Sequence, residues 1–312
     1  MAALLSQKNW QDIFYTSRDG LRLYARHYPA PADARARHRR PMLCLPGLTR
    51  NCRDFHDLAT FMTDPANPSA RDVFAVDYRG RGRSAPAPDW QSYTLQQELA
   101  DVLDLMTLAG LHDVGLVGTS RGGLLAMLMA TTRPAAVGAV VLNDIGPVVE
   151  REGLLRIVAY IGRVPLPPTW AEAGQLVRDL NKRQFPAVPE HHWDDIARQL
   201  FNEEHGVPVH GYDQALAKAI GVPEGAIPSL WPQFDALARV PMLTIRGELS
   251  DILSAATVSE MRLHHPGLES VTVRGQGHAP LLRDRPTMIA VADFLLRSDQ
   301  AAGRASPARA YA

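Results

Sequence analysis

The sequence has little cysteine, no long apolar run and no excess of charge, and each shortage argues against a class of protein. Only two of the 312 residues are cysteines, Cys44 and Cys52. We expect reduced thiols, with a single bridge as the alternative. No apolar run approaches the roughly eighteen residues of a membrane span, and the short apolar stretch before Ser6 is no signal peptide. These absences predict a cytoplasmic protein without a membrane span.

Charge and metal-ligand patterns are equally sparse. The 33 basic and 33 acidic side chains cancel, and no run of like charge marks a surface for nucleic acid or anionic lipid. No cysteine and histidine spacing is typical of a zinc site. We therefore expect no nucleic-acid partner, no metal and no cofactor, and a monomer or homodimer that acts on a small molecule.

A strict alternation of strands and helices fills most of the chain. "DIFYTSRDGLRLYARHY" alternates apolar and polar residues around Asp19 and Gly20, which predicts an opening hairpin. Apolar runs then alternate with helical stretches; these runs are "PMLCLPG", "DVFAVDY", "DVGLVGTS", "VGAVVLNDIG", "VPMLTIRG" and "LESVTVRG". Unbroken apolar strands separated by helices indicate an α/β fold with a mostly parallel central sheet and helices on both faces.

Two helices have clear sequence boundaries. Thr94 and Gln97 form a capping box at the start of "TLQQELADVLDLMTLAG", and Gly110 ends that helix. "RPTMIAVADFLLR" predicts a final helix. The Ala-, Arg- and Ser-rich residues 299–312 have no apolar periodicity, which predicts a disordered tail.

The alternation is interrupted once, after the sixth predicted strand. Residues 148–235 contain four amphipathic helical patterns, divided by Pro-rich connections, and no convincing buried strand. We expect a helical cap over the carboxyl ends of the strands, where open parallel sheets bind ligands; a decorative insertion is the alternative. The core would then comprise residues 1–147 and 236–298.

The motif "GTSRGG" gives the first candidate catalytic residue. Ser120 lies between a predicted strand and a predicted helix, where Gly118 and Gly122 permit a sharp turn. A serine in that context is a nucleophile exposed at the top of the sheet. Chance alone predicts roughly 0.1 copies of Gly-x-Ser-x-Gly in a chain of this composition.

A nucleophilic serine needs a base and a carboxylate. His278 in "VRGQGHAPLL" follows the last predicted strand, and we predict it as the base. For the acid we prefer Asp251 in "IRGELSDILS", over Glu248 in the same loop and over Asp144, whose position at a strand end also suits a turn or cap.

Two backbone amides are expected to stabilise the oxyanion. One belongs to Arg121, which directly follows the nucleophile, and the other to Leu48, because Gly47 lets the backbone approach closely. In the cap, Tyr160 and Trp170 are candidates for substrate contact, as is Leu281 after the histidine loop.

These motifs together resemble the α/β-hydrolase superfamily, from the opening hairpin to the last helix. "GTSRGG" looks like its nucleophile elbow, "DYRGRGRS" like its Gly-rich loop and "LPGLTRN" like its oxyanion loop, with Pro46 where a histidine is common. "RGELSDILS" and "GQGHAPLL" are similar to the acid and histidine loops of lidded bacterial members.

The resemblance implies a serine hydrolase that forms an acyl-enzyme, with a carboxylesterase of small or medium apolar esters as the favoured function. The alternatives are a lactonase, a carbon-carbon bond hydrolase, or a slow or non-enzymatic receptor that binds a ligand in the same fold. Haloalkane dehalogenases and epoxide hydrolases of this fold carry an aspartate where this chain has Ser120, so alkyl displacement is disfavoured.

Overall fold

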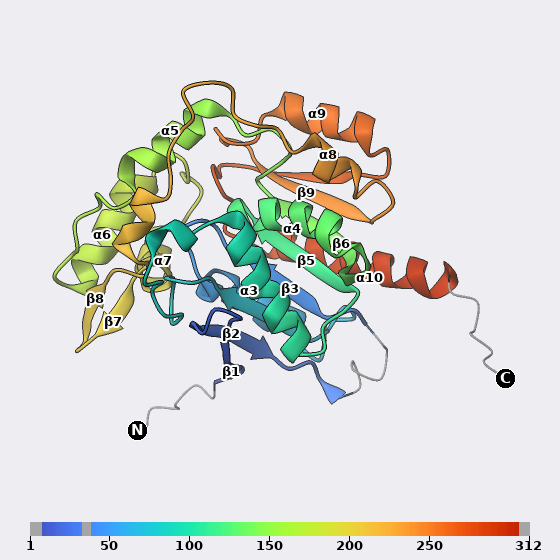
Figure 1. Ribbon diagram of the computed structural model, residues 1–312, viewed down its shortest axis with the longest axis horizontal. Helices are drawn as coiled ribbons and strands as arrows, with labels where there is room; N and C mark the ends of the chain where they lie inside the picture. The colour runs from blue at the N-terminus through green and yellow to red at the C-terminus, as the bar shows by residue number, and fades with distance from the viewer. Residues whose placement is uncertain (1–7, 33–38, 306–312) are drawn as a thin grey trace.

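The computed structural model describes residues 8–32 and 39–305 and is built around one eight-stranded sheet (Figure 1). The strand order is β1-β2-β4-β3-β5-β6-β9-β10. The strands are β1 (Gln11–Thr16), β2 (Arg22–Tyr28), β3 (Met42–Leu45), β4 (Val73–Asp77), β5 (Val114–Thr119), β6 (Val137–Asn143), β9 (Met242–Gly247) and β10 (Glu269–Val273). All pairs from β4 to β10 are parallel, whereas β1 and β2 are antiparallel. The predicted mostly parallel sheet and opening hairpin are confirmed.

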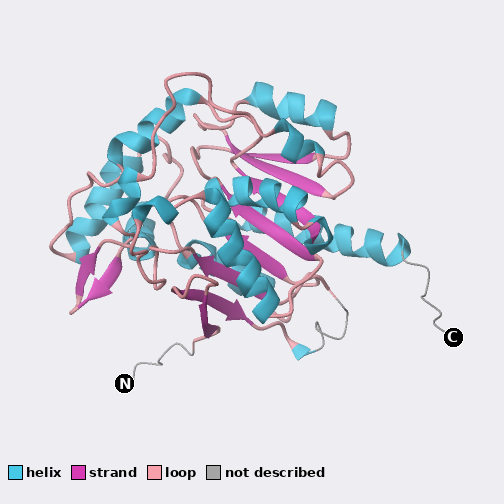
Figure 2. Ribbon diagram, in the orientation of Figure 1, coloured by secondary structure: helices cyan, strands magenta, loops and turns pink. Residues whose placement is uncertain are grey.

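Helices cover both faces of the sheet (Figure 2). One face carries α3 (Leu95–Leu108), α4 (Arg121–Thr132), α8 (Trp231–Asp235) and α9 (Ala255–His264), and the other carries α2 (His56–Met62) and α10 (Arg285–Ala305). Strand β3 shows why: Leu43 and Leu45 pack into the first layer, and Met42 and Cys44 into the second. Because successive side chains of a strand point to opposite faces, a strand buried on both sides is apolar throughout.

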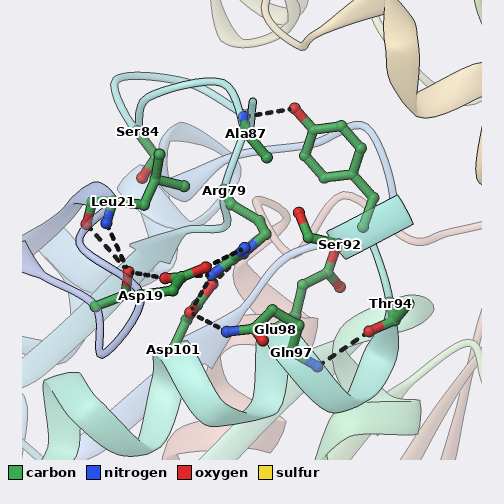
Figure 3. Close-up of polar contacts among 12 residues, drawn as sticks. Asp19, Leu21, Arg79, Ser84, Ala87, Ser92, Thr94, Gln97, Glu98 and Asp101 are labelled. Carbon is green, nitrogen blue, oxygen red and sulfur yellow. Dashed lines mark hydrogen bonds and ion pairs between the residues drawn. The ribbon is translucent and has the colours of Figure 1, made fainter. Parts of the chain in front are cut away.

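The start of α3 is fixed by its cap and by a buried arginine nearby. The Thr94 hydroxyl accepts a hydrogen bond from the Gln97 amide at 3.2 Å, which is one half of the predicted capping box. The other half is not formed, because the Thr94 amide donates to the Ser92 carbonyl and the Gln97 side chain donates to Asp101. Close by, Figure 3 shows Arg79 between Asp101 of α3 and Asp19 of the β1–β2 turn, at 2.7 and 3.0 Å. These ion pairs tie the opening hairpin to α3.

The C-terminal end differs in part from the prediction. Helix α10 continues to Ala305, so residues 299–305, expected in a disordered tail, are helical; residues 306–312 lie outside the described part. No helix in the described ranges is long and apolar enough to cross a membrane. Cys44 and Cys52 are both buried and free of any disulfide.

Residues 148–235, here called the insert, lie to one side of the sheet in Figure 1, except for the last helix of the range, α8, which lies over the sheet. The insert contains α5 (Arg151–Tyr160), α6 (Trp170–Asn181), α7 (Trp193–Leu200), the strands β7 (Asn202–Glu204) and β8 (Val207–Val209), and a 3-10 turn at Gln214–Lys218. The small β7–β8 hairpin was not predicted, since its strands are only three residues long. At its tip His205 and Gly206 both adopt positive φ.

The insert has its own core, and it leaves and rejoins the sheet domain at one place. It also contacts that domain elsewhere, because the Gly82 amide donates to the Gly211 carbonyl and Ile157 belongs to the main core. Val177 of α6, Phe185, and Trp193 and Ile196 of α7 form a separate apolar cluster. At its base, the Leu230 amide donates to the Pro147 carbonyl at 2.7 Å. The chain thus leaves the sheet domain and returns to it at one point. Helix α8, within the last residues of the predicted cap range, packs into the main core.

Candidate active site

Ser120 occupies a sharp turn between β5 and α4. Its φ is 51°, in the left-handed region, and its amide donates to the Asn143 carbonyl at 3.0 Å. A Cβ on Gly122 would overlap the carbonyl oxygen of Leu45, and one on Gly118 would overlap the backbone of Gly122. Glycine is therefore required on both sides of the serine for α4 to start this close to the sheet.

His278 faces Ser120 from the loop after β10. The Ser120 hydroxyl and His278 Nε2 are 2.8 Å apart, and the imidazole side chain is 7% exposed. Asn143, at the end of β6, connects the segments that carry this pair. Its side-chain nitrogen donates to the Thr119 hydroxyl at 3.0 Å and to the Pro280 carbonyl at 2.9 Å. One buried amide thus links the nucleophile strand to the histidine loop.

The carboxylate beside His278 is Asp144. Its Oδ2 lies 2.8 Å from His278 Nδ1 and accepts a second hydrogen bond from the Ser250 hydroxyl at 2.6 Å. Its Oδ1 accepts from the Gly247 amide at 2.7 Å, and the side chain is fully buried. Asp144 adopts a φ of 56°, a conformation that aspartate tolerates better than most residues. Three donors and complete burial fix this carboxylate against the imidazole.

The preferred assignment of Asp251 as the acid does not fit this geometry. Both oxygens of Asp251 face Arg156 of α5, at 2.5 and 2.9 Å, and Gln184 donates to it at 3.1 Å. Burial alone would raise the pKa of Asp251, but the Arg156 guanidinium outweighs it and holds that pKa below its ordinary value. The other alternative, Glu248, accepts the Gly275 amide at 2.8 Å.

The order of the strands explains why Asp144, and not Asp251, lies beside His278. Strand β6 is hydrogen-bonded directly to β5, so a side chain at the end of β6 lies next to the nucleophile turn. Asp251 is on the loop after β9, one strand further away, and an arginine of the insert takes both of its oxygens. The sequence shows all three carboxylates at strand ends but does not show which strand neighbours β5.

The two predicted oxyanion residues are joined by a buried ion-pair network. Arg121 Nε lies 2.5 Å from Glu98 of α3, and the other oxygen of Glu98 lies 2.8 Å from Arg81. Arg81 Nε donates to the Leu48 carbonyl at 2.9 Å. Burial would raise the pKa of Glu98, but the two arginines lower it below its ordinary value. Sequence analysis missed Arg81 and Glu98, because neither belongs to a motif read as catalytic.

A cavity of about 470 Å³ opens above Ser120 and His278, between the sheet domain and the insert. Leu48, Tyr160 and Leu281 line it, as expected of residues near the substrate. Trp170 lies outside the lining and instead stacks under Arg198 within the insert. Two arginines, Arg50 and Arg156, also line the cavity and had not been singled out from the sequence.

No candidate metal centre accompanies this site. Within residues 8–32 and 39–305, no three His, Cys, Asp or Glu side chains converge as ligands for a metal ion. Ser120 and His278 line the cavity, and Asp144 is buried behind His278.

Comparison with known proteins identifies the family. The model of the alpha/beta hydrolase family matches residues 42–292. The chain belongs to this family. A solved α/β hydrolase from Novosphingobium aromaticivorans is 40% identical and covers 93% of this chain and 99% of its own, with a TM-score of 0.84.

Two curated relatives extend over most of the chain. A 3-hydroxybutyrate-oligomer hydrolase of Cupriavidus necator is 32% identical over 266 residues, 81% of this chain and 87% of the relative. A 2-(acetamidomethylene)succinate hydrolase of Mesorhizobium japonicum is 28% identical over 247 residues, 76% of this chain and 81% of the relative. This α/β hydrolase is thus a hydrolytic enzyme, and its fold agrees with the resemblance found in its motifs.

Proposed function

We propose that this protein is a carboxylic ester hydrolase in which Ser120, His278 and Asp144 act as nucleophile, base and acid. The observation that carries this proposal is the unbroken hydrogen-bonded chain: Ser120 Oγ to His278 Nε2 and His278 Nδ1 to Asp144 Oδ2, each 2.8 Å. Such a chain activates a serine hydroxyl, which is otherwise a weak nucleophile.

The reaction proceeds through an acyl-enzyme. Ser120 attacks the ester carbonyl while His278 takes its proton, and Asp144 stabilises the imidazolium that forms. The tetrahedral oxygen is bound by the Leu48 amide, in the loop after β3, and by the Arg121 amide at the start of α4, where the helix dipole favours negative charge. His278 then protonates the departing alcohol, and water repeats the sequence on the acyl group.

The cavity and one relative support ester hydrolysis in particular. The hydrolase of Cupriavidus necator acts on 3-hydroxybutyrate oligomers, whose units are joined by ester bonds. The cavity volume of about 470 Å³ lies in the range of small-molecule sites. In this proposal the insert is a lid whose apolar side chains, Ile157 and Leu176 among them, select the acyl part.

The decisive experiment compares turnover and covalent labelling in matched serine variants. Wild type, Ser120→Ala and the exposed-site control Ser259→Ala, on α9, are assayed with p-nitrophenyl esters of graded acyl length. The same three proteins are treated with a fluorophosphonate and weighed by mass spectrometry. We expect turnover and a single adduct in wild type and the control. Both should disappear in Ser120→Ala, with kcat falling by about a thousandfold or more.

Two results would contradict the proposal. Full activity in a folded Ser120→Ala protein would remove the serine from the mechanism. A folded wild type that turns over no ester of any length would overturn ester hydrolysis, and lactones, carbon-carbon substrates and stoichiometric ligand binding would then be measured.

A further inference from the structure

The cavity wall contains two guanidinium groups that the proposed mechanism does not use. Arg50 belongs to the loop after β3 in the sheet domain, two residues beyond Leu48, and Arg156 lies on α5 of the insert. Among the described residues that line the cavity, Asp54 is the one acidic residue. Elsewhere the wall is largely apolar, with Phe55, Ile157 and other aliphatic and aromatic residues. Positive groups in such a wall are costly to desolvate and require a compensating partner.

Each guanidinium is held rigidly by one carboxylate. Arg50 donates Nε and Nη2 to the two oxygens of Asp54, at 2.7 and 2.6 Å. Arg156 donates the same two nitrogens to Asp251, at 2.5 and 2.9 Å. This fork geometry fixes the plane of each guanidinium and leaves its Nη1 directed elsewhere. Within the described ranges, no hydrogen bond from Nη1 of Arg50 is found, and besides Asp251 the Tyr160 hydroxyl is the further side-chain partner of Arg156.

The two arginines lie near each other and near the nucleophile. Tyr160 lines the same cavity as both arginines. Burial raises the pKa of its phenol, and the charges of Arg156 and Arg50 both oppose that rise. A Cβ placed on Gly47 would lie 3.2 Å from the Arg50 side chain and 3.9 Å from that of Ser120. The stem of Arg50 therefore borders the oxyanion loop itself.

We propose that Arg50 and Arg156, together with the Tyr160 hydroxyl, bind a free carboxylate of the substrate. This inference rests on the proposed ester hydrolysis and specifies its substrate class. The preferred substrates are then short esters that carry a carboxylate, such as half-esters of dicarboxylic acids and linear oligoesters of hydroxy acids. Neutral esters of equal length would fill the same cavity without using the two Nη1 groups.

Charge balance favours a carboxylate over a phosphate monoester. Asp54 and Asp251 already neutralise the two guanidiniums, so the cluster has no formal net charge before a ligand binds. A singly charged, planar carboxylate leaves the cluster with one net negative charge and can accept from two arginine nitrogens. A phosphate monoester would leave close to two net negative charges in the same partly buried place, which is more costly.

A matched pair of chromogenic esters tests the inference. Mono-p-nitrophenyl adipate and p-nitrophenyl hexanoate have the same leaving group and acyl length and differ in the terminal carboxylate. For wild type we expect kcat/KM to favour the adipate ester by about tenfold or more, after subtraction of the rate with Ser120→Ala. In Arg156→Gln and Arg50→Gln that preference should fall close to unity, mainly because KM for the adipate ester rises.

Four further variants separate recognition from structure. Arg178→Gln removes an arginine of the insert that pairs with Glu190 outside the cavity wall, and it should keep the preference. Asp251→Asn and Asp54→Asn break the same ion pairs yet retain the guanidiniums, so they should keep the preference as well. Arg156→Lys keeps the charge without the fork and should give an intermediate ratio. If Asp251→Asn abolishes the preference as completely as Arg156→Gln, the arginine acts only by holding the insert, and the inference is wrong.

A binding measurement keeps this inference distinct from the proposed function. Ser120→Ala protein is titrated calorimetrically with monomethyl adipate and with dimethyl adipate. Saturable binding of the monoester, weakened at least tenfold by Arg156→Gln, supports the carboxylate site even if wild type hydrolyses neither ester. Equal kcat/KM for the two chromogenic esters, or equal binding of the two adipates, would overturn the site and leave ester hydrolysis standing.

Discussion

The charged groups on the sheet side of the active site are more deeply buried, and so more rigidly held, than those on the side of the insert. On the sheet side, Asp144 is fully buried with three donors, and Glu98 is fully buried between two arginines. On the insert side, the ion pair of Arg156 and Asp251 has side chains 36% and 21% exposed. Breaking a buried pair costs about 3–5 kcal/mol, whereas an exposed pair contributes roughly 0–1 kcal/mol.

This difference indicates a division of labour within the site. The sheet side holds the groups that must keep their geometry within fractions of an ångström for the chemical step. The insert side holds the groups that choose the substrate and can be altered at small cost in stability. If the division is correct, substitutions on the sheet side lower kcat, and substitutions on the insert side change which substrate is preferred.

The sharpest test compares the two aspartates near His278. Asp144→Asn should lower kcat by about a thousandfold or more, because the imidazole loses the carboxylate that sets its tautomer and stabilises its charge. Asp251→Asn should lower kcat on p-nitrophenyl hexanoate by less than about tenfold, since it touches the insert side alone. Steady-state kinetics of both variants measure this, and the opposite ranking would make Asp251 the acid.

A second test removes the charge between the oxyanion residues. Glu98→Gln leaves Arg81 and Arg121 buried without their shared partner, and should lower the free energy of unfolding by about 3–5 kcal/mol. Below the melting temperature, kcat should fall more than KM rises, because the Leu48 and Arg121 amides act in the transition state.

The matched control is an insert glutamate. The ion pair of Glu203 with Arg198 is more than half exposed on both sides, so Glu203→Gln should change stability by no more than about 0.5 kcal/mol. Urea denaturation and initial rates give both quantities. Equal loss in the two variants would contradict the contrast between the two sides.

A third test changes the volume of the insert side. Leu180 of α6 lines the cavity yet is 56% exposed, so Leu180→Trp should fold normally and reduce the space for the acyl group. We expect the preferred p-nitrophenyl ester to become shorter by about two carbons while kcat on the acetate changes less than threefold. Leu263→Trp, at an 82% exposed position of α9, is the control and should leave the length profile unchanged.

The smallest expected effect is the pH dependence of the Arg156–Asp251 pair. Because the pKa of Asp251 is lowered in the folded protein, the pair stabilises fully above the ordinary aspartate pKa of about 3.9. That contribution, at most about 1 kcal/mol, is lost as the pH falls through the folded pKa. The difference in urea stability between wild type and Asp251→Asn should therefore shrink from pH 6 to pH 3. A difference independent of pH would assign the effect to packing.

The parts of the structure that depend on local pattern could be predicted from sequence. The parallel strands, the helix cap at Thr94 and the positions of Ser120 and His278 follow from periodicity and glycine spacing. These signals are carried by a few neighbouring residues. The length of α10 was underestimated, because its last residues lack the apolar periodicity that marked its start.

The parts that depend on distant contacts could not be predicted. Choosing among Asp144, Glu248 and Asp251 requires knowing that β6 is hydrogen-bonded to β5, and that Arg156 reaches Asp251 from the insert. The positive φ of Asp144 is consistent with its strand-end sequence, but a turn or cap would use the same conformation. Arg50 and Arg156 were missed because an arginine becomes informative only when its neighbours in space are known.

The hydrogen bond between Pro147 and Leu230 has a consequence for how such an enzyme can change. Because the insert starts and ends at one point, a change in its length does not by itself move the ends of the flanking strands β6 and β9. Doubling the length of a loop costs only about 0.6 kcal/mol in closure entropy. Changes in the length of the insert should therefore be tolerated best outside the segments that contact the sheet domain, such as Ile157 in the main core and Gly211, whose carbonyl accepts from the Gly82 amide.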